Sequence, residues 1–519
     1  MRKVTCMALR ADQLPNDVNI LKSMLMAEHL LVDKLKLQIA MLRRMKFGQS
    51  SEQLDLQIEQ LELIVDEIQT QHGEQEAFAP QEPQTVEAAP RLRKLLPEHL
   101  PRETHTHTVE CACKQCGATQ WRLVGEDVSE VLEFVPEHFK VIRHVRTKMS
   151  CGVCQSMTQA PATSRPLGKS PVGAGLLAHV LVSKYLDHLP LYRQSQIYAR
   201  QGVELERSTL ADWMGGASAL LRPLTQAIQK HVLAAHKLHG DDTPVPVLQP
   251  GRDTTKQGRL WGYCRDDRAS ANTDPPAVWF TYTPDRKAVH PNTHLKGWSG
   301  ILQADGYAGY DALYQSGRVI EAACWAHARR KFNDFLQATG SPVAQEALHR
   351  IAKLYAIEKG IRGKPKEERE LIRQTESAPL LADLHAWLKT TYASVSSKSE
   401  LGEAIAYSLN RWQALINYVQ DGRIEMDNNA IEREIRPIAL GKKNWLFAGS
   451  DQGGHRAAAM YTILNTAKLN GINPEKYLHY VLARINEHKI NRIDELLPWN
   501  VDLEKDESPA APVEQELAA

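Results

Sequence analysis

The sequence predicts a multidomain α/β protein with a helical N-terminal segment, a small metal-binding module and a mixed α/β core. Three observations support this prediction. Apolar residues recur at helical spacing near the N-terminus, two cysteine pairs follow, and short β-branched and aromatic strands then alternate with helices. The 519 residues are enough for about three domains, and the apolar fraction of 43% excludes a largely disordered chain.

Charge is distributed unevenly along the chain, although the net charge is only +1. Residues 1–90 hold 9 Lys/Arg against 14 Asp/Glu, and residues 501–519 hold 1 against 6. Residues 91–500 therefore carry 53 basic and 42 acidic side chains. A basic body between acidic ends favours a polyanionic partner, although long solvated helices also vary in charge. Because no apolar run reaches the roughly 18 residues of a membrane span and the start lacks a signal-peptide pattern, we expect a cytoplasmic protein without membrane contact.

Residues 20–70 have the spacing of a coiled coil. Apolar side chains follow in steps of four and three from Leu21 to Leu42, and the series resumes from Leu54 to Ile68. This period predicts a leucine zipper that pairs protomers or binds a partner helix, with a helical hairpin packed on the body as the alternative. The following segment is rich in Glu, Gln, Pro and Ala without apolar periodicity, which predicts a linker, and the acidic tail from residue 501 has the same character.

Four of the eight cysteines form two Cys-x-x-Cys pairs, Cys113 with Cys116 and Cys151 with Cys154. In a cytoplasmic protein two such pairs indicate metal binding more than disulfides. Four thiolates make a closed tetrahedral zinc site, which is structural and leaves no open position for catalysis. Residues 128–145 are rich in β-forming residues and long enough to connect the pairs as a zinc ribbon. Redox-active or free thiols are the alternative.

Residues 190–213 have the pattern of a helix-turn-helix pair. The first helix is expected to end at Gly202, and Ser208 or Thr209 would cap the second, which is expected to run through residue 213. Helix pairs of this kind also occur in ordinary cores, so the pattern leaves DNA binding and packing open. The arginines that would lie near DNA phosphates are Arg193, Arg200 and Arg207.

The centre of the chain reads as alternating strands and helices. The expected strands cover residues 238–248, 259–264, 277–282, 300–307 and 319–325. An acid that closes an apolar strand beside a glycine is exposed at a sheet edge, and Asp241 and Asp305 fit that description. With a third acid from a later helix, two such carboxylates can hold two divalent ions about 4 Å apart for phosphodiester chemistry. Magnesium or manganese suits an oxygen-only site, and Glu432, after an expected N-cap at Asp427, is the candidate third acid. A lone Asp at a strand end is usually a turn former, so spacing alone does not establish the site.

Several long segments resemble the transposase of the insertion-sequence family numbered sixty-six. In the core these are HGDDTPVPVL, LQADGYAGYDAL, CWAHARRKF and DNNAIEREIRPIALGKKNWLFAGSDQGG. MLRRMKFGQSSEQL resembles the leucine-zipper segment of that family, the paired Cys-x-x-Cys motifs resemble its zinc-binding domain, and LLPWN resembles its C-terminal signature. The resemblance covers about residues 20–500 and leaves the acidic tail outside.

The resemblance implies an RNase H-like catalytic core of the DDE type. Carried over by motif, the catalytic residues and ligands of two Mg²⁺ or Mn²⁺ ions are Asp241, Asp305 and Glu432. The residue after the first Asp is usually Glu in this family and is Asp242 here, which makes Asp242 an alternative first ligand. His327 lies where related DDE enzymes carry a motif between the last two acids, and it is a candidate auxiliary residue. A helical insertion is expected at about residues 340–420.

Other residues of these motifs fit supporting roles. The basic side chains expected to hold DNA phosphates are Arg329, Arg330, Arg433, Arg436, Lys442 and Lys443. Trp445 and Phe447 are either core residues or surfaces on which a displaced base stacks. Residues 449–454 lack the Lys-Ser/Thr ending of a phosphate loop and are expected to form a flexible turn.

The resemblance also implies how the chain is divided. The expected parts are residues 1–72 (helical leucine-zipper segment), 73–100 (linker), 101–165 (zinc-binding domain), 166–235 (helical, helix-turn-helix-like DNA-binding region), 236–454 (RNase H-like catalytic domain with the helical insertion), 455–500 (C-terminal helical region) and 501–519 (acidic disordered tail).

The expected function is that of a bacterial, nucleoid-associated DNA transposase, which cuts element ends and joins the 3′-OH to target DNA. Its expected partners are DNA, at least one further copy of the chain, and small accessory proteins encoded alongside. A non-catalytic, zinc-containing DNA-binding regulator and a nuclease that cuts without joining are the alternatives.

Overall fold

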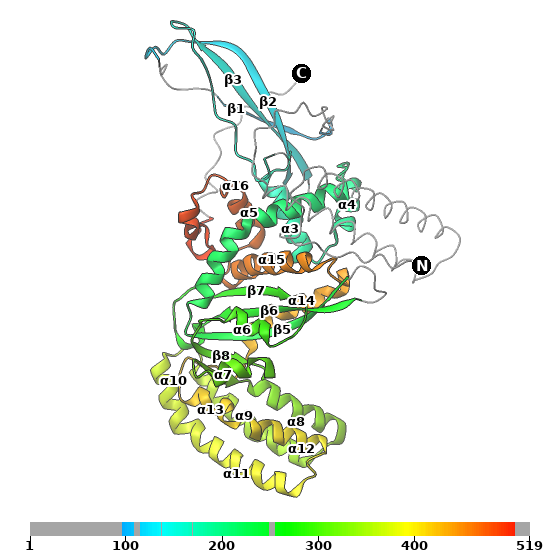
Figure 1. Ribbon diagram of the computed structural model, residues 1–519, viewed down its shortest axis with the longest axis vertical. Coiled ribbons are helices and arrows are strands. Elements are labelled where there is room, and N and C mark those ends of the chain that lie inside the picture. The colour runs from blue at the N-terminus through cyan, green and yellow to red at the C-terminus, as the bar shows by residue number, and fades with distance from the viewer. Residues whose placement is uncertain (1–95, 108–114, 136–137, 169, 249–254, 504–519) are drawn as a thin grey trace, which may run out of the picture.

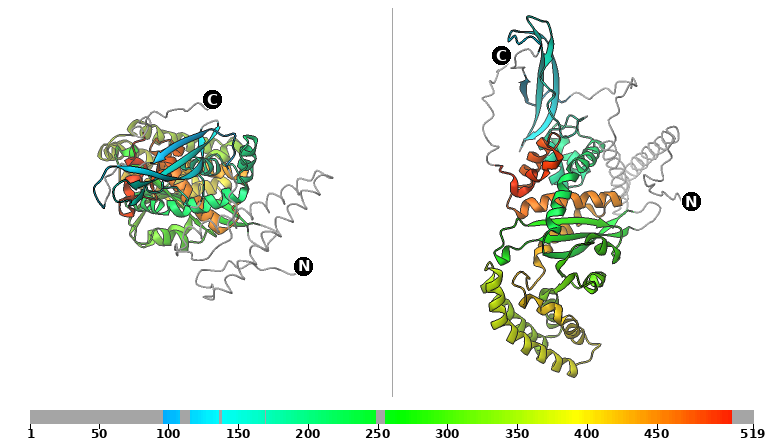
Figure 2. Two further views of the ribbon diagram at one scale, coloured as in Figure 1. Left: turned by 90° about the horizontal axis from the view of Figure 1, so that it is seen from above. Right: turned by 60° about the vertical axis from the view of Figure 1, so that its left-hand side comes forward.

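The computed structural model describes residues 96–107, 115–135, 138–168, 170–248 and 255–503. The predicted leucine zipper, most of the linker, nearly all of the acidic tail and Cys113 lie outside these residues. The described chain is elongated, with a narrow β-sheet at one end, a helical region at the other and a mixed sheet between them (Figures 1 and 2). No helix in the described ranges is long and apolar enough to cross a membrane.

The narrow sheet is built on a long hairpin. Its strands are β1 (Arg102–His107), β2 (Trp121–Val135), β3 (His138–Cys151) and β4 (Met157–Gln159), in the order β1-β3-β2 with β4 on the edge of β3. β2 and β3 are antiparallel from the pair Val135–His138 to the pair Trp121–Cys151. The β-rich stretch predicted at 128–145 is therefore confirmed as the half of the hairpin in which β2 ends and β3 begins. Leu132, Phe139 and Val141 anchor this half of the hairpin because they are buried in the main hydrophobic core.

Three helices connect the hairpin to the mixed sheet: α3 (Ala174–Tyr185), α4 (Leu191–Arg200) and α5 (Arg207–Leu233). The predicted helix pair at 190–213 is present as α4 and the start of α5, but the predicted end of the second helix is wrong. α5 runs for 27 residues, because Leu210, Met214, Ala217, Leu221 and further apolar residues at helical spacing are buried along one face. The predicted caps are also wrong, because Glu206 is the N-cap and no side chain caps the helix.

The mixed sheet contains all five predicted strands. They are β5 (Lys237–Val247), β6 (Lys256–Arg265), β7 (Ala277–Thr283), β8 (Gly300–Ala304) and β9 (Val319–Ala323). The strand order is β7-β6-β5-β8-β9, in which β5, β6 and β7 are antiparallel and β8 and β9 run parallel to β5. β5 is thus the central strand, flanked by a hairpin meander on one side and by parallel crossovers on the other.

α14 (Asn429–Trp445) packs on β5 and β6, and α5 and α15 (Asp451–Leu469) pack chiefly against β7 (Figure 1). The Thr462 hydroxyl accepts a hydrogen bond from the backbone N–H of Phe280 at 2.9 Å, so α15 lies along the outer edge of β7. The shorter segments η2 (Arg268–Ser270), α6 (Val289–His294), η3 (Ala308–Tyr310) and α7 (Asp311–Gln315) connect the strands. The C-terminal elements α16 (Pro474–Arg484), η6 (Ile490–Leu496) and η7 (Pro498–Asn500) follow α15, and α16 packs against α3.

The flexible turn predicted at 449–454 is wrong, because this segment begins α15. The Ser450 hydroxyl accepts a hydrogen bond from the backbone N–H of Gly453 at 3.2 Å, which makes Ser450 the N-cap. Gly454 permits a close approach, since a Cβ there would lie 2.5 Å from the ring of Tyr282. The glycines of this segment therefore serve helix packing on β7.

A separate helical region lies between β9 and α14. It contains α8 (Trp325–Thr339), α9 (Pro342–Ile361), α10 (Lys366–Ile372), the π-helical η4 (Arg373–Ser377), α11 (Ala378–Ser394), α12 (Glu400–Asn410), α13 (Trp412–Ile416) and η5 (Asn417–Val419). Most of its apolar residues form a second hydrophobic core, distinct from the main one. The fully buried Arg373 crosses this core and pairs with both carboxylate oxygens of Glu358 at 2.7 Å. Helices thus fill the interval 340–420 in which the sequence predicts an insertion.

Candidate functional site

Asp241 lies on β5, and Asp305 directly follows the neighbouring strand β8. β5 and β8 are parallel, with Lys237 opposite Ile301 and His239 opposite Gln303. Continuing this register by two residues places Asp241 opposite Asp305, and neighbouring strands are about 4.8 Å apart. Asp241 faces α14, because its partner across the β5–β6 ladder is Gly262, where a Cβ would meet Ile431 of α14 at 2.7 Å.

Asn428 fixes the start of α14 against β5. Its side-chain amide donates to the carbonyl of Gly240 at 3.0 Å, and its Oδ1 lies 3.0 Å from Nδ1 of His239. Since an amide oxygen only accepts, His239 carries its proton on Nδ1. The backbone N–H of Asn428 points to Sγ of Cys324 at 3.2 Å. His239 and Gly240 directly precede Asp241, and Cys324 lies beside Glu432. The buried Asn428 therefore fixes the start of α14, four residues before Glu432, against β5.

The three predicted acids act on one another electrostatically. The pKa of Asp241 is raised to about 8, first by burial and then by the negative charge of Asp305, with a smaller contribution from Glu432. Among the described residues no lysine or arginine forms an ion pair with Asp241. Its carboxylate only accepts a hydrogen bond from the backbone N–H of Asp242. The site therefore accumulates negative charge that a cation would relieve.

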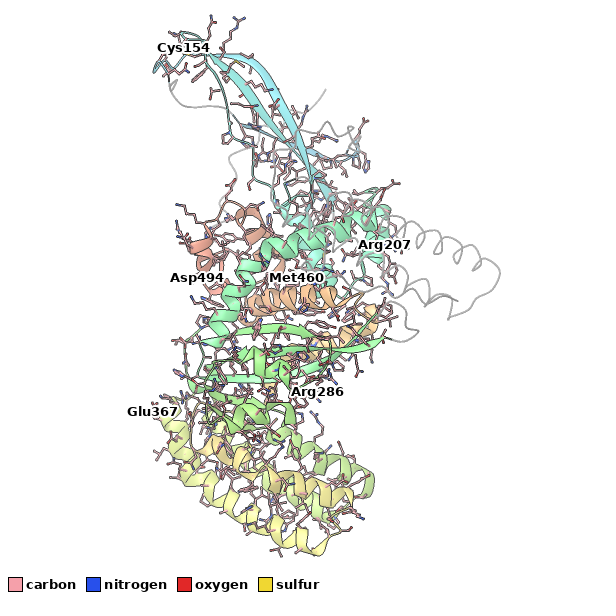
Figure 3. The ribbon with its side chains drawn as sticks, viewed as in Figure 1. Cys154, Arg207, Arg286, Glu367, Met460 and Asp494 are labelled. Atoms are coloured by element: carbon pink, nitrogen blue, oxygen red, sulfur yellow. The ribbon has the colours of Figure 1, made fainter. Side chains whose placement is uncertain are left out.

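Asp242 has a different environment from Asp241, because successive strand residues point to opposite faces of the sheet. Its side chain is 3% exposed and pairs with Arg259 at 3.0 Å and with Nη2 of Arg286 at 2.8 Å. Burial raises its pKa despite these two arginines. Arg286 also reaches Asp305 at 3.6 Å, and it lies at the mixed sheet in Figure 3. The structure thus pairs Asp242 with two cations, whereas Asp241 has no such partner among the described residues. The three predicted acids are not among the sets of described residues whose possible ligand atoms all lie within 4.8 Å of one another.

His327 and Cys324 lie beside Glu432 at the start of α8. Nδ1 of His327 is 3.8 Å from Oε1 of Glu432, and both atoms are buried without a hydrogen-bond partner in the described part of the chain. Together with Sγ of Cys324 they form a group whose possible ligand atoms lie within 4.8 Å of one another. Burial raises the pKa of the Cys324 thiol to about 12, so without a bound cation this sulfur is protonated at neutral pH.

The predicted DNA-binding residues fall into separate groups. Arg433, Arg436 and Lys443 are exposed and recur at helical spacing on α14, so they form one basic stripe. The half-buried Lys442 of the same helix donates to the carbonyl of Pro244 at 3.4 Å. Arg329 and Arg330 are exposed on α8, where Arg330 lies 4.0 Å from Glu432. Arg193 and Arg200 are exposed on α4, and the half-buried Arg207 begins α5.

Sequence reasoning missed two residues that shape this site. Asn428 follows Asp427 directly in a motif that was recognised, so its position was available, but its contact with β5 was not. The N-cap of α14 is Asn428, not Asp427 as predicted, and Asp427 instead accepts from the N–H of Asn429 at 3.1 Å. Arg286 comes from a loop after β7 and carries no sequence signal at all.

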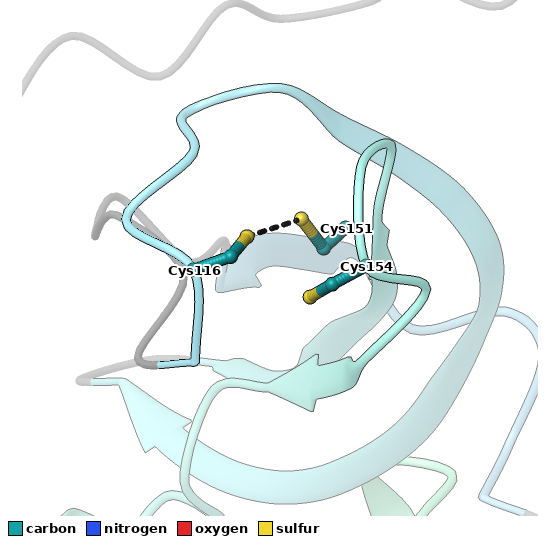
Figure 4. A group of neighbouring side chains, drawn as sticks. All are labelled: Cys116, Cys151 and Cys154. Carbon is teal, nitrogen blue, oxygen red and sulfur yellow. Dashed lines mark hydrogen bonds between the residues drawn. The ribbon is translucent and has the colours of Figure 1, made fainter.

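Three cysteines of the predicted zinc site converge at the open end of the β2–β3 hairpin, where β2 begins and β3 ends (Figure 4). The Sγ atoms of Cys116 and Cys151 are 3.6 Å apart, and those of Cys116, Cys151 and Cys154 all lie within 4.8 Å of one another. Tetrahedral zinc with Zn–S bonds of about 2.3 Å requires Sγ–Sγ separations near 3.8 Å, so the three thiols fit this ion. The fourth predicted ligand, Cys113, lies outside the described residues.

The sequence was compared with known protein families and with known proteins. Matching family profiles are the IS66 transposase family (residues 169–456), the IS66 C-terminal element (462–499), the segment described as transposase C of IS166 homeodomain (34–104) and the zinc-finger binding domain of IS66 transposase (110–155).

Similar proteins come from Sinorhizobium fredii and are themselves uncharacterized. One, y4hP, is 40% identical over 487 residues, covering 90% of this chain and 88% of the relative. Another, y4jD, is 36% identical and covers 95% of this chain and 98% of the relative. Since the first profile spans more than half of the 519 residues and includes Asp241, Asp305 and Glu432, the chain belongs to the IS66 transposase family.

Proposed function

We propose that the chain is a DDE-type DNA transposase with an RNase H-like core. Asp241, Asp305 and Glu432 would hold two Mg²⁺ or Mn²⁺ ions, cut the ends of a DNA element and join the 3′-OH to target DNA. The observation that carries this proposal is the placement of Asp241 on β5 and of Asp305 directly after the neighbouring β8, together with the pKa of Asp241, which both other acids raise. An oxygen-only donor set suits these hard cations.

The residues around the acids have distinct roles in this proposal. When bound, the ions would activate the attacking water or 3′-hydroxyl and stabilise the leaving oxygen. Asn428 ties the start of α14, four residues before Glu432, to β5, and Arg286 contacts the carboxylate of Asp305 at 3.6 Å. His327 faces Glu432 at 3.8 Å and is placed to accept or donate a proton there. Asp242, already paired with two arginines, is structural.

Other parts of the chain would bind DNA. The basic stripe of α14 begins one residue after Glu432 and would hold phosphates on both sides of the cut bond. The zinc-stabilised hairpin and the α4–α5 pair would hold the element ends, and the N-terminal zipper would pair protomers in the cytoplasm, on the nucleoid. Small accessory proteins are further candidate partners.

Asp305→Asn tests the catalytic proposal. It removes one negative oxygen with little change in size, so we expect cleavage of element-end DNA in Mg²⁺ to fall by at least about 10³-fold while DNA binding and thermal unfolding stay close to wild type. The matched control is Asp311→Asn, an exposed acid six residues further along the chain, which should cut normally.

The outcomes separate the rival functions. Equal cleavage by wild type and Asp305→Asn would remove these acids from catalysis. A wild-type protein that binds DNA but never cuts it would be a DNA-binding regulator. A strand-transfer assay with a pre-cut end tells a transposase from a nuclease, because only the transposase joins that end to a second duplex.

A further inference from the structure

An aromatic pocket lies on the same sheet face as the acids, at the far end of α14. Its walls include the rings of Tyr185, Tyr282, Trp445, Phe447 and Tyr461. Its floor includes Val245, which points to the same face of β5 as Asp241 because four residues separate them. At about 3.3 Å per residue, the pocket begins roughly 13 Å from Asp241.

A strained turn holds two of these rings in place. Leu446 has φ 60° and ψ −50°, and the N–H of Phe447 donates to the carbonyl of Trp445 at 2.7 Å, which is the rare γ-turn with positive φ. The turn is held because the N–H of Ala448 donates to Pro246 at 2.8 Å and Leu248 donates back to Ala448 at 2.9 Å. Trp445 and Phe447, on either side of this fixed turn in the sequence, both line the pocket.

A second strained residue borders the same pocket. His188 has φ 58°, and its ring lies so close to α14 that a Cβ on Gly441 would approach it to 2.2 Å. Its Nδ1 is buried without a hydrogen-bond partner in the described chain. Only four non-glycine residues in the described ranges have positive φ, and His188 and Leu446 are two of them. Backbone strain that the surroundings maintain is concentrated at binding sites.

The charged residues around the pocket are mostly basic. Lys184 and the buried Arg456 are among its lining residues, and Lys443 of the basic stripe precedes Trp445 by two residues on α14. The nearby acid Asp451 is paired with Lys256 at 2.6 Å. Aromatic walls with basic neighbours match a nucleotide, since the rings stack on a base and the cations attract its phosphate.

We propose that this pocket receives a nucleobase displaced from the DNA beside the bond that is cut. The inference rests on the proposed function, because it requires DNA at Asp241, and it adds that the duplex is distorted there. A displaced base would leave its stack, enter beside Trp445 and stack on that ring, while the basic stripe holds the strand on either side. Because every base has an aromatic face, the pocket would accept any base by stacking.

Trp445→Ala in the full-length chain, assayed on duplexes from the ends of the DNA element that encodes it, tests the inference. We expect cleavage to slow by 10- to 100-fold while DNA affinity changes less than about threefold. An abasic nucleotide at one position near the cut should restore cleavage by this variant to within about threefold, because an absent base does not have to be unstacked. Trp445→Phe should stay close to wild type.

Two comparisons keep this test decisive. Trp387→Ala, in the helical region, is the matched control and should cut at the wild-type rate. With the wild-type protein, 2-aminopurine placed at the rescuing position should change its fluorescence on binding. This measurement does not use the variant, so it does not depend on whether Trp445→Ala folds. Wild-type cleavage by Trp445→Ala, or a defect that no abasic position rescues, would overturn the inference and leave the proposed function intact. Failure of wild type to cut any end duplex would overturn both.

Discussion

At the scale of single residues, the distinction between Asp241 and Asp242 matters most. The sequence identified both residues as candidates but could not choose between them. Successive strand residues face opposite sides of the sheet, and the sequence alone does not show what packs on each side. The structure gives the two residues different surroundings, because Arg259 and Arg286 pair with Asp242 at 3.0 and 2.8 Å and neither pairs with Asp241. Arg286 lies 44 residues away in a loop, so no local pattern predicts this pairing.

The raised pKa of Asp241 predicts a pH-dependent response to metal. Its folded pKa of about 8 lies above the ordinary value of 3.8, so the metal-free native state retains a proton that the unfolded chain releases. The contribution of Asp241 to the free energy of unfolding therefore falls as pH rises from about 4 to 8. Because Mg²⁺ replaces that proton, it should raise the melting temperature by at least about 2 °C at pH 8 and much less at pH 5. Asp241→Asn should lose both the pH dependence and the Mg²⁺ effect in calorimetry, whereas equal stabilisation of the variant would contradict the metal site.

At the scale of secondary-structure elements, local sequence patterns predicted which helices and strands exist better than where each one begins and ends. All five strands of the mixed sheet appear where β-branched and aromatic residues gather. α5 runs far beyond its predicted end because tertiary packing along its whole length, not a cap, determines where it stops. The start of α15 was mistaken for a flexible turn because its glycines suggested a loop, whereas Gly454 serves close packing against Tyr282.

The anchoring of α14 gives a prediction at this scale. Asn428→Ala removes both hydrogen bonds to β5 and leaves His239 and the carbonyl of Gly240 unsatisfied in the core. We expect a loss of about 2–4 kcal/mol in the free energy of unfolding and, at a temperature where the variant is folded, a fall in the cleavage rate with little change in DNA affinity. Chemical denaturation and cleavage kinetics test this, with Asn429→Ala as the neighbouring control. A variant that is destabilised yet cuts at the wild-type rate would show that Asn428 does not position Glu432.

At the scale of the whole molecule, the arrangement was the least predictable feature. The cysteine pairs and acids were all visible in sequence, but the strand order β7-β6-β5-β8-β9 arises from long-range pairing that no segment encodes alone. The distance between the thiols at the open end of the β2–β3 hairpin and the acids of the mixed sheet is likewise not encoded in any single segment. Figure 3 shows Cys154 at one end of the elongated body and Arg286 at the mixed sheet in its middle, so we expect the two sites to respond to metal independently.

Removal of zinc tests that independence. A strong zinc chelator should unfold the open end of the β2–β3 hairpin, because few buried side chains near Cys151 hold it. The mixed sheet should stay folded. Hydrogen exchange should then rise at residues 115–125 and 147–157 and remain unchanged in β5 and α14. Cys151→Ser should behave like the chelated protein. Uniform exchange across the chain would mean that the thiols stabilise the entire molecule.

The chain enters the helical region after β9 and leaves it before α14 at neighbouring points. The backbone N–H of Trp325, at its entrance, donates to the carbonyl of Met426, at its exit, at 3.0 Å. Beyond this bond, α12 also touches the loop that follows β8, because the hydroxyl of Tyr407 donates to the carbonyl of Asp305 at 3.3 Å and Arg411 donates to the carbonyl of Gly306 at 2.6 Å. Natural variation in length should therefore be tolerated in the parts of the region that do not touch the sheet, whereas changes in α12 should shift the backbone at Asp305.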